Sequence, residues 1–107
     1  MTEDAKPFAL VVRFTVRPGA EARFDELVAD TAAGIRASEP DTLIYACHHV
    51  DGQARQRIFY ELYRDRAAFD AHEEQSHTRR FLAEREQYLA SHKVDWLTLQ
   101  TGKGTDG

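Results

Sequence analysis

The spacing of apolar and polar positions changes from strand-like to helix-like early in the chain. Residues 8–16 (FALVVRFTV) are β-branched and aromatic, which predicts a strand, and Arg-Pro-Gly at 17–19 ends it. From Ala20 onward apolar residues recur every three or four positions, the spacing of one face of an amphipathic helix. Pro40 disfavours helical geometry at the residue before it, so we expect this helix to end near Ser38.

Three further apolar runs have the composition of strands. Residues 42–50 (TLIYACHHV) and 56–63 (QRIFYELY) are separated by a short polar stretch that contains Asp-Gly at 51–52. This pair is typical of hairpin turns, so the two strands are expected to be neighbours in the sheet. Residues 94–100 (VDWLTLQ) predict a last strand.

Two capping residues lie between the third and the last predicted strand. Asp65 and Ser76 each precede a segment with apolar residues at helical spacing, so we expect both to be helix N-caps. Two caps so close together predict a break or bend near Ser76. The apolar residues assigned to the two helical segments are Ala67, Ala68, Phe69, Phe81, Leu82, Tyr88 and Leu89.

The order β-α-β-β-α-β predicts an α+β fold, a ferredoxin-like sandwich with one antiparallel sheet and its helices on one face. The strands are apolar on both faces; in the first one, for example, Leu10 and Phe14 alternate with Val11. Such a sheet needs two covers, and the chain has helices for only one. We therefore expect a homodimer whose sheets pack face to face.

Composition and charge narrow the classes of function. The chain has 107 residues, 42% of them apolar, which suffices for one domain with one core. Its 14 basic and 18 acidic residues give a net charge of −4, and the basic residues are scattered, so nucleic acid is not an expected partner. Neither a signal peptide nor a run of about 18 apolar residues is found, so we expect a cytoplasmic protein that does not enter membranes.

Domain bounds follow from the same patterns. We expect one domain over residues 8–100, between a flexible N-terminus (1–7) and a polar, glycine-rich, flexible tail (101–107). Cys47 is the single cysteine, so the chain can form no internal disulfide and no thiolate metal cluster. We expect Cys47 to be a small core residue.

Several segments, taken in order, are similar to those of one known family. The matching segments are Val16-Arg17-Pro18-Gly19-Ala20-Glu21, Glu39-Pro40, Leu43-Ile44-Tyr45, Phe59 to Tyr63, Asp65 to His72, Ser76-His77 and Phe81. Together they resemble the antibiotic-biosynthesis monooxygenase family. The resemblance implies small ferredoxin-like subunits that pair into a dimeric α+β barrel, in agreement with the sheet that is apolar on both faces.

The resemblance also implies a chemistry. It implies oxidation of a small phenolic, hydroquinone or polyketide-type aromatic substrate by O₂, without flavin, metal or haem. A haem-degrading branch of the family places its ligating histidine near Leu82-Ala83, where this chain has none. Tyr63 stands where the family often has tryptophan, and Asp41 where a glycine usually follows the Glu-Pro pair. The substrate preference of members with tryptophan is therefore not expected to transfer.

His72 is the predicted catalytic base. It follows Phe69 by three residues, so on a helix the two side chains share the buried face. A histidine satisfied within the core would fit that spacing equally well. The family pattern places a histidine here in the ligand cavity, and an imidazole pKa of about 6.5 suits removal of a phenolic proton near neutral pH.

Glu61 and Tyr63 are the other predicted catalytic residues. They share one face of the third strand, where Glu61 is a carboxylate in an otherwise apolar run. Glu61 either acts as a buried acceptor that orients His72 or binds a substrate hydroxyl, or it forms a cross-strand ion pair, for instance with Arg13. Tyr63 is expected to line the pocket and to hold the substrate ring by stacking or hydrogen bonding.

The remaining candidates concern binding of substrate or metal. On one continuous helix, at about 100° per residue, His77 would point about 140° away from His72, so only a break at Ser76 could bring the rings together. His48 and His49 are adjacent on a strand and point to opposite faces, so no metal site is expected. The residues predicted to bind substrate are Phe69, Phe81, His77, Phe14 and Leu10.

The sequence thus favours a monooxygenase that uses no cofactor, with a small aromatic substrate and O₂ as partners. Two alternatives stay open. The same pocket could belong to a ligand-binding or stress-related dimer without turnover, or to an isomerase of a small metabolite that uses His72 as acid and base.

Overall fold

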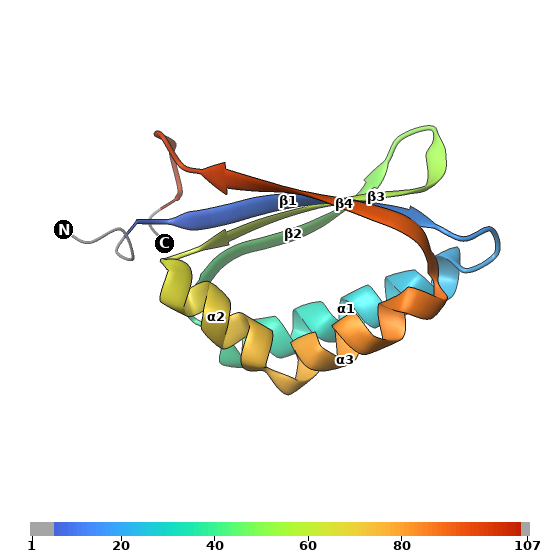
Figure 1. Cartoon of the computed structure of the whole chain (residues 1–107), viewed down its shortest axis with the longest axis horizontal. Coiled ribbons are helices and arrows are strands. Elements are labelled where there is room, and N and C mark those ends of the chain that lie inside the picture. Colours follow the sequence, from blue (N-terminus) through green and yellow to red (C-terminus); the bar gives the residue numbers. More distant parts are fainter. Residues whose placement is uncertain (1–5, 106–107) are drawn as a thin grey trace.

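Residues 6–105, which the computed structural model describes, form one antiparallel sheet with helices against one of its faces (Figure 1). The sheet order is β2-β3-β1-β4. This is the α+β, ferredoxin-like fold expected from the sequence, with the second helix divided in two. The elements are β1 (Phe8–Val16), α1 (Glu21–Ser38), β2 (Thr42–Val50), β3 (Gln53–Tyr63), α2 (Arg66–Glu74), α3 (Ser76–Glu84), the 3₁₀ turn η2 (Arg85–Gln87) and β4 (Leu89–Thr98).

Two strands begin earlier than predicted. β3 begins at Gln53 because the hairpin turn holds only Asp51 and Gly52, and Gln53 already pairs with Val50. Gly52 has a positive φ of 77°, a conformation that glycine adopts without strain. β4 begins at Leu89, paired with Val16 across a register shift, so this residue belongs to the sheet and not to a helix.

The helical region between β3 and β4 is interrupted near Ser76, as predicted, but the interrupting residue is Gln75. Asp65 caps α2 as predicted, accepting a hydrogen bond from the Ala68 N–H at 2.8 Å. Gln75 is extended (φ −67°, ψ 144°) and separates α2 from α3. The prediction that Ser76 is the second N-cap is wrong, since Gln75 takes that place and no side chain caps α3. None of the helices in residues 6–105 is long and apolar enough to cross a bilayer.

The core lies between the helices and the inner face of the sheet. Its centre holds one phenylalanine from each of four elements, with contacting ring centroids 4.7 to 6.3 Å apart. The tilted and edge-on rings fix α1 and α3 against β1 and β3, so side chains on these elements have a rigid support. The four residues are Phe14, Phe24, Phe59 and Phe81.

The outer face of the sheet carries no helix within residues 6–105 (Figure 1). The register divides this face into an apolar end and a polar end. The next row beyond the apolar end places His48, Arg13 and Lys93 around Ile58. The sheet is therefore apolar on both faces over half its length, as predicted. The apolar rows are Ile44-Leu62-Ala9-Leu97 and Ala46-Tyr60-Val11, the second of which ends at Asp95 on β4.

The predicted flexible ends are only partly described. Residues 1–5 of the N-terminus and 106–107 of the tail lie outside the described residues. Residues 99–105 follow β4 without forming a helix or strand. The domain bounds 8–100 and the flexibility of both ends therefore stay predictions.

Candidate active site

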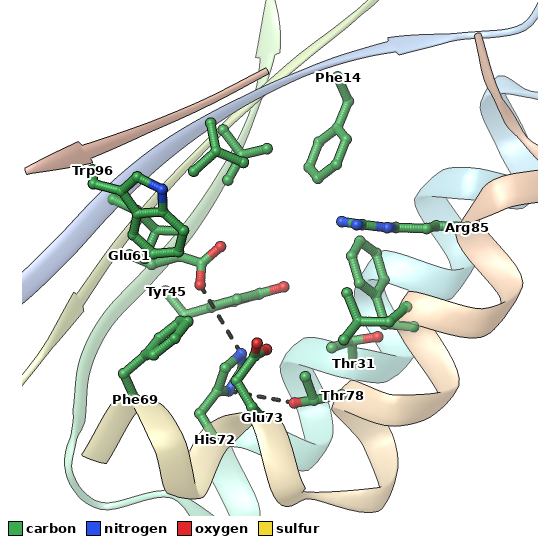
Figure 2. A pocket seen from close by; sticks show the side chains of 15 residues that line it. Phe14, Thr31, Tyr45, Glu61, Phe69, His72, Glu73, Thr78, Arg85 and Trp96 are labelled. Carbon is green, nitrogen blue, oxygen red and sulfur yellow. Dashed lines mark hydrogen bonds and ion pairs between the residues drawn. The ribbon is translucent and has the colours of Figure 1, made fainter. Parts of the chain in front are cut away.

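A cavity of about 200 Å³ lies between the inner face of the sheet and helices α2 and α3 (Figure 2). Two predicted catalytic residues, His72 and Glu61, line it. The other lining residues are mainly apolar or aromatic, and Trp96 among them is 60% exposed. Four of the five predicted binding residues are in the wall: Leu10, Phe14, Phe69 and Phe81. Lining residues that sequence reasoning missed include Thr31, Tyr45, Glu73, Thr78, Arg85 and Val94.

His72 extends from α2 into this cavity, and only 6% of its side chain is exposed. Its Nδ1 lies 2.8 Å from Oε1 of Glu39 and 3.3 Å from Oγ1 of Thr78. Its Nε2 lies 4.0 Å from Oε1 of Glu61 (Figure 2). Because the Glu39 carboxylate only accepts hydrogen bonds, we assign the proton of a neutral His72 to Nδ1. Nε2 then carries the free lone pair.

Glu39 is the main site residue that sequence reasoning missed. It follows α1 as its C-cap, and its side chain is 5% exposed. Its carboxylate accepts hydrogen bonds from both His72 and His77, and from the Thr42 hydroxyl at 2.7 Å. Burial alone would raise the pKa of Glu39, but these hydrogen bonds and the charge of His72 hold it below its usual value. The only sequence signal was the Glu39-Pro40 pair that closes the first helix.

His77 lies on the other side of Glu39, outside the cavity wall. It was predicted to bind substrate, and the structure does not bring it into contact with the cavity. The extended Gln75 reorients α3 relative to α2, so both imidazoles reach one carboxylate despite their helical spacing. His77 therefore supports Glu39, which in turn holds His72.

Glu61 and Tyr63 form a buried pair on β3. The Tyr63 hydroxyl donates to Oε1 of Glu61 at 2.5 Å. Burial raises the pKa of Glu61, and it also raises that of Tyr63, where the neighbouring Glu61 adds to the effect. The alternative of an Arg13–Glu61 ion pair is wrong, because Arg13 lies on the outer face of the sheet and donates to Gln56.

Tyr63 does not line the cavity, although it was expected to stack on the substrate ring. Its side chain is fully buried and packs edge-on against Phe69, with ring centroids 5.3 Å apart. It therefore lies behind the cavity wall, in contact with the lining residues Glu61, Phe69 and His72.

Comparison with protein families gives one match, the antibiotic biosynthesis monooxygenase family model, over residues 7–84. The chain belongs to this family. The structures of similar proteins agree with the fold. A Pseudomonas aeruginosa protein is 25% identical, with a TM-score of 0.82 over 94% of this chain and 100% of its own. A Caulobacter crescentus protein provisionally named an antibiotic biosynthesis monooxygenase is 21% identical, with a TM-score of 0.85 over 92% and 94% of the two chains. A comparison with proteins of curated function finds no match.

Within this family member, the described side chains combine a base and an apolar wall. Nε2 of His72 can accept a proton, and the imidazolium so formed would lie between the carboxylates of Glu39 and Glu61. Apolar side chains such as Phe14 and Phe81 make up much of the wall, which strengthens these electrostatic interactions. The arrangement is suited to taking a proton from a weakly acidic ligand.

Two expectations about other chemistry can be compared with the structure. Cys47 is exposed on β2, so the prediction of a small core residue is wrong. Among residues 6–105, no group of three or more His, Cys, Asp or Glu side chains is arranged to hold a metal ion.

Proposed function

We propose that this protein is a monooxygenase that oxidises a small phenolic, hydroquinone or polyketide-type aromatic with O₂ and uses no cofactor. The observation that carries the proposal is the His72–Glu39 pair: a buried imidazole with one nitrogen fixed by a carboxylate and the other next to an apolar cavity. Membership of the monooxygenase family supports the reaction class.

The first step is removal of a proton. O₂ has a triplet ground state and reacts slowly with closed-shell molecules, whereas a phenolate donates one electron far more readily than a phenol. His72 takes the phenolic proton on Nε2, and Glu39 stabilises the resulting imidazolium through Nδ1.

The second step takes place in the same cavity. The phenolate passes one electron to O₂, and the radical pair combines to form a C–O bond. One oxygen atom stays in the product and the other leaves as water, with all four electrons supplied by the substrate. Leu10, Phe14, Phe69 and Phe81 exclude water during this step.

The proposal includes a homodimer in the cytoplasm. The apolar end of the outer sheet face, defined by the two rows from Ile44 to Leu97 and from Ala46 to Val11, supports packing against a second copy. Face-to-face pairing would leave the cavity of each subunit between its own helices and sheet.

Oxygen consumption tests the proposed function. The purified protein is incubated with a panel of hydroquinones and phenols in an oxygen electrode, and His72→Ala is expected to lower the rate of uptake by about 10²- to 10⁴-fold. His49→Ala is the control, because His49 is exposed on β2 beside Asp25, away from the cavity. Uptake that is unchanged in His72→Ala would refute the role of His72.

The two alternatives give other results in the same assay. Stabilisation by aromatic compounds without oxygen uptake would identify a binding module. Interconversion of a metabolite without oxygen uptake, lost in His72→Ala, would identify an isomerase.

A further inference from the structure

Arg85 carries a cationic group into the cavity, at the end away from His72 (Figure 2). It is the first residue of η2, directly after α3. Only 17% of its side chain is exposed. Its guanidinium carbon lies 5.8 Å from the ring centroid of Phe14 and 5.7 Å from that of Phe81. The two rings hold the guanidinium in the cavity wall.

The guanidinium lacks the hydrogen bonds that a buried arginine needs. Nε of Arg85 is buried with no hydrogen-bond partner, and no hydrogen bond to this guanidinium is found within residues 6–105. The exposed Glu86 carboxylate forms an ion pair with Nε at 3.7 Å, which is too long for a hydrogen bond. An unsatisfied buried cationic donor is costly, which points to a ligand that completes it.

Arg57 shows what a satisfied buried arginine looks like in the same chain. Its Nε and Nη2 donate to the Asp25 carboxylate at 2.8 and 3.0 Å. Its Nη1 donates to the backbone oxygens of Ala54 and Gln56 at 2.8 and 2.9 Å. Arg85 differs from Arg57 in that its Nε has no such partner, and Arg85 is the one of the two that lines the same cavity as His72.

The charges of the cavity are arranged by sign. Glu61 and Glu73 lie with His72 at one end, and Arg85 lies at the other (Figure 2). An anionic group on a ligand is repelled from the first end and attracted to Arg85. A hydroxyl on the opposite side of the same ligand then faces His72. A cavity of about 200 Å³ is smaller than typical drug-sized pockets, so the ligand is of about one ring.

We propose that Arg85 binds a carboxylate on the aromatic substrate, so that the substrate class is the hydroxyaromatic acids. The guanidinium accommodates the two carboxylate oxygens in the geometry that arginine forms with such groups. This inference deepens the proposed function and rests on it, since it assigns the substrate class of the same cavity.

A matched pair of probes tests the proposal without turnover. 4-Hydroxyphenylacetate and its carboxamide have the same shape, and only the first is an anion. Titration calorimetry of the natural chain is expected to show binding of the acid about 10- to 100-fold tighter than binding of the amide. Equal affinities, or binding of neither probe at about 10 mM, would overturn the proposal.

Variants assign the preference to Arg85. Arg85→Gln is expected to remove the preference for the acid, and Arg85→Lys to retain part of it, because lysine keeps the charge without the planar fork. Arg80→Gln is the matched control, since Arg80 is an exposed α3 arginine that pairs with Glu84 outside the cavity. A preference that survives Arg85→Gln overturns the proposal. If Arg85→Gln does not fold, the proposal is tested by comparing the ratio of acid to amide affinity in the natural chain with the same ratio in Arg85→Lys.

The result is separable from that of the oxygen assay. If the acid binds tightly but no hydroquinone acid supports oxygen uptake, the proposed anion site at Arg85 is supported and the proposed monooxygenase function is refuted. If oxygen uptake is equally fast with neutral and acidic hydroquinones, the proposed monooxygenase function is supported and the proposed anion site at Arg85 is refuted.

Discussion

One carboxylate, Glu39, organises the polar part of the site. It accepts hydrogen bonds from His72, His77 and Thr42, which come from three different elements or their ends. The carboxylate fixes Nδ1 of His72 as the protonated nitrogen, which in the proposed reaction leaves Nε2 to take the proton. These donors favour the ionised form of the Glu39 carboxyl group, so the network stabilises the fold while Glu39 is ionised.

We predict that Glu39→Gln weakens both the fold and the reaction. At pH 7 the free energy of unfolding is expected to fall by about 3 kcal/mol, since a buried charged network loses its centre. The pKa of Glu39 is lower in the folded than in the unfolded chain, so its stabilisation is present above its usual value of 4.5 and is lost as the pH falls through the folded pKa. The difference in Tm between the natural chain and Glu39→Gln should therefore narrow below about pH 4.5.

Thermal unfolding from pH 3 to pH 8 checks this prediction, with the pH values chosen to span roughly the range of carboxylate titration. Glu84→Gln serves as control, because Glu84 pairs with Arg80 on the surface. A difference in Tm that stays constant with pH would contradict the assigned role. In the oxygen assay, a lower kcat with unchanged KM would mark Glu39 as a positioning residue.

Site residues that stand out within a local sequence pattern could be identified from the sequence, whereas those brought into the site only by the fold could not. Glu61 was found because it is a carboxylate in an apolar strand, and His72 was found because its helical spacing agrees with the family resemblance. Glu39 is 33 residues from His72 and 38 from His77, so no local pattern links them. Arg85 was missed because an arginine in a charged helix end looks like an ordinary solvated residue.

At the scale of elements, the break at Gln75 does most to shape the site. It divides one helical stretch into α2 and α3, and α3 then packs closely against α1. The contact is tightest at Gly34 of α1, where an added Cβ would lie 2.6 Å from Cγ of His77 and 2.9 Å from its Cβ. Glycine is therefore required at this helical position by the approach of the neighbouring helix.

We predict that Gly34→Ala destabilises the protein, although alanine favours helices. Overpacking against His77 is expected to cost about 1–3 kcal/mol, more than the gain of up to about 1 kcal/mol in helix propensity. Urea unfolding of Gly34→Ala, His77→Ala and the double variant measures the coupling. The double variant should be more stable than the sum of the single effects. A simple sum would mean that the contact with His77 is not the cause.

Element types were predictable from period and composition, and boundaries were less so. The range of β2 was predicted as the structure has it, because turn residues and Pro40 enclose its apolar run. The start of β4 was missed by five residues because Leu89 to Lys93 carry little apolar signal. Pairing with β1 makes this stretch a strand, and that pairing is not visible in its own sequence.

At the scale of the whole molecule, the outer face of the sheet decides the assembly. Its apolar end carries no helix within residues 6–105; Leu62 and Ala9 there are buried, whereas Leu97 is 38% exposed. Proteins that remain single chains rarely leave a sheet face of this kind open to water. The polar end, with Arg13 and Lys93, can face water and requires no covering partner.

We predict that Val11→Glu converts a dimer into a monomer. Val11 lies at the apolar end, between Tyr60 and Asp95, where a new carboxylate would be buried by the second copy. Light scattering at micromolar concentration measures the mass, and circular dichroism shows whether the subunit stays folded. Lys93→Glu on the polar end should remain a dimer. A natural chain that is a monomer under these conditions would contradict the predicted assembly.

The sheet order also determines which contacts this protein avoids. β2 and β4 are the edge strands, and each leaves one row of backbone N–H and C=O groups without a strand partner in residues 6–105. Such an edge is a template for strand-by-strand growth into fibres, and charged side chains on it discourage that growth. β4 carries Lys93 and Asp95 along this edge. In the proposed dimer, two faces that cover each other form a closed pair, whereas edges that join can continue without limit. Charged edges would therefore favour an assembly of fixed size.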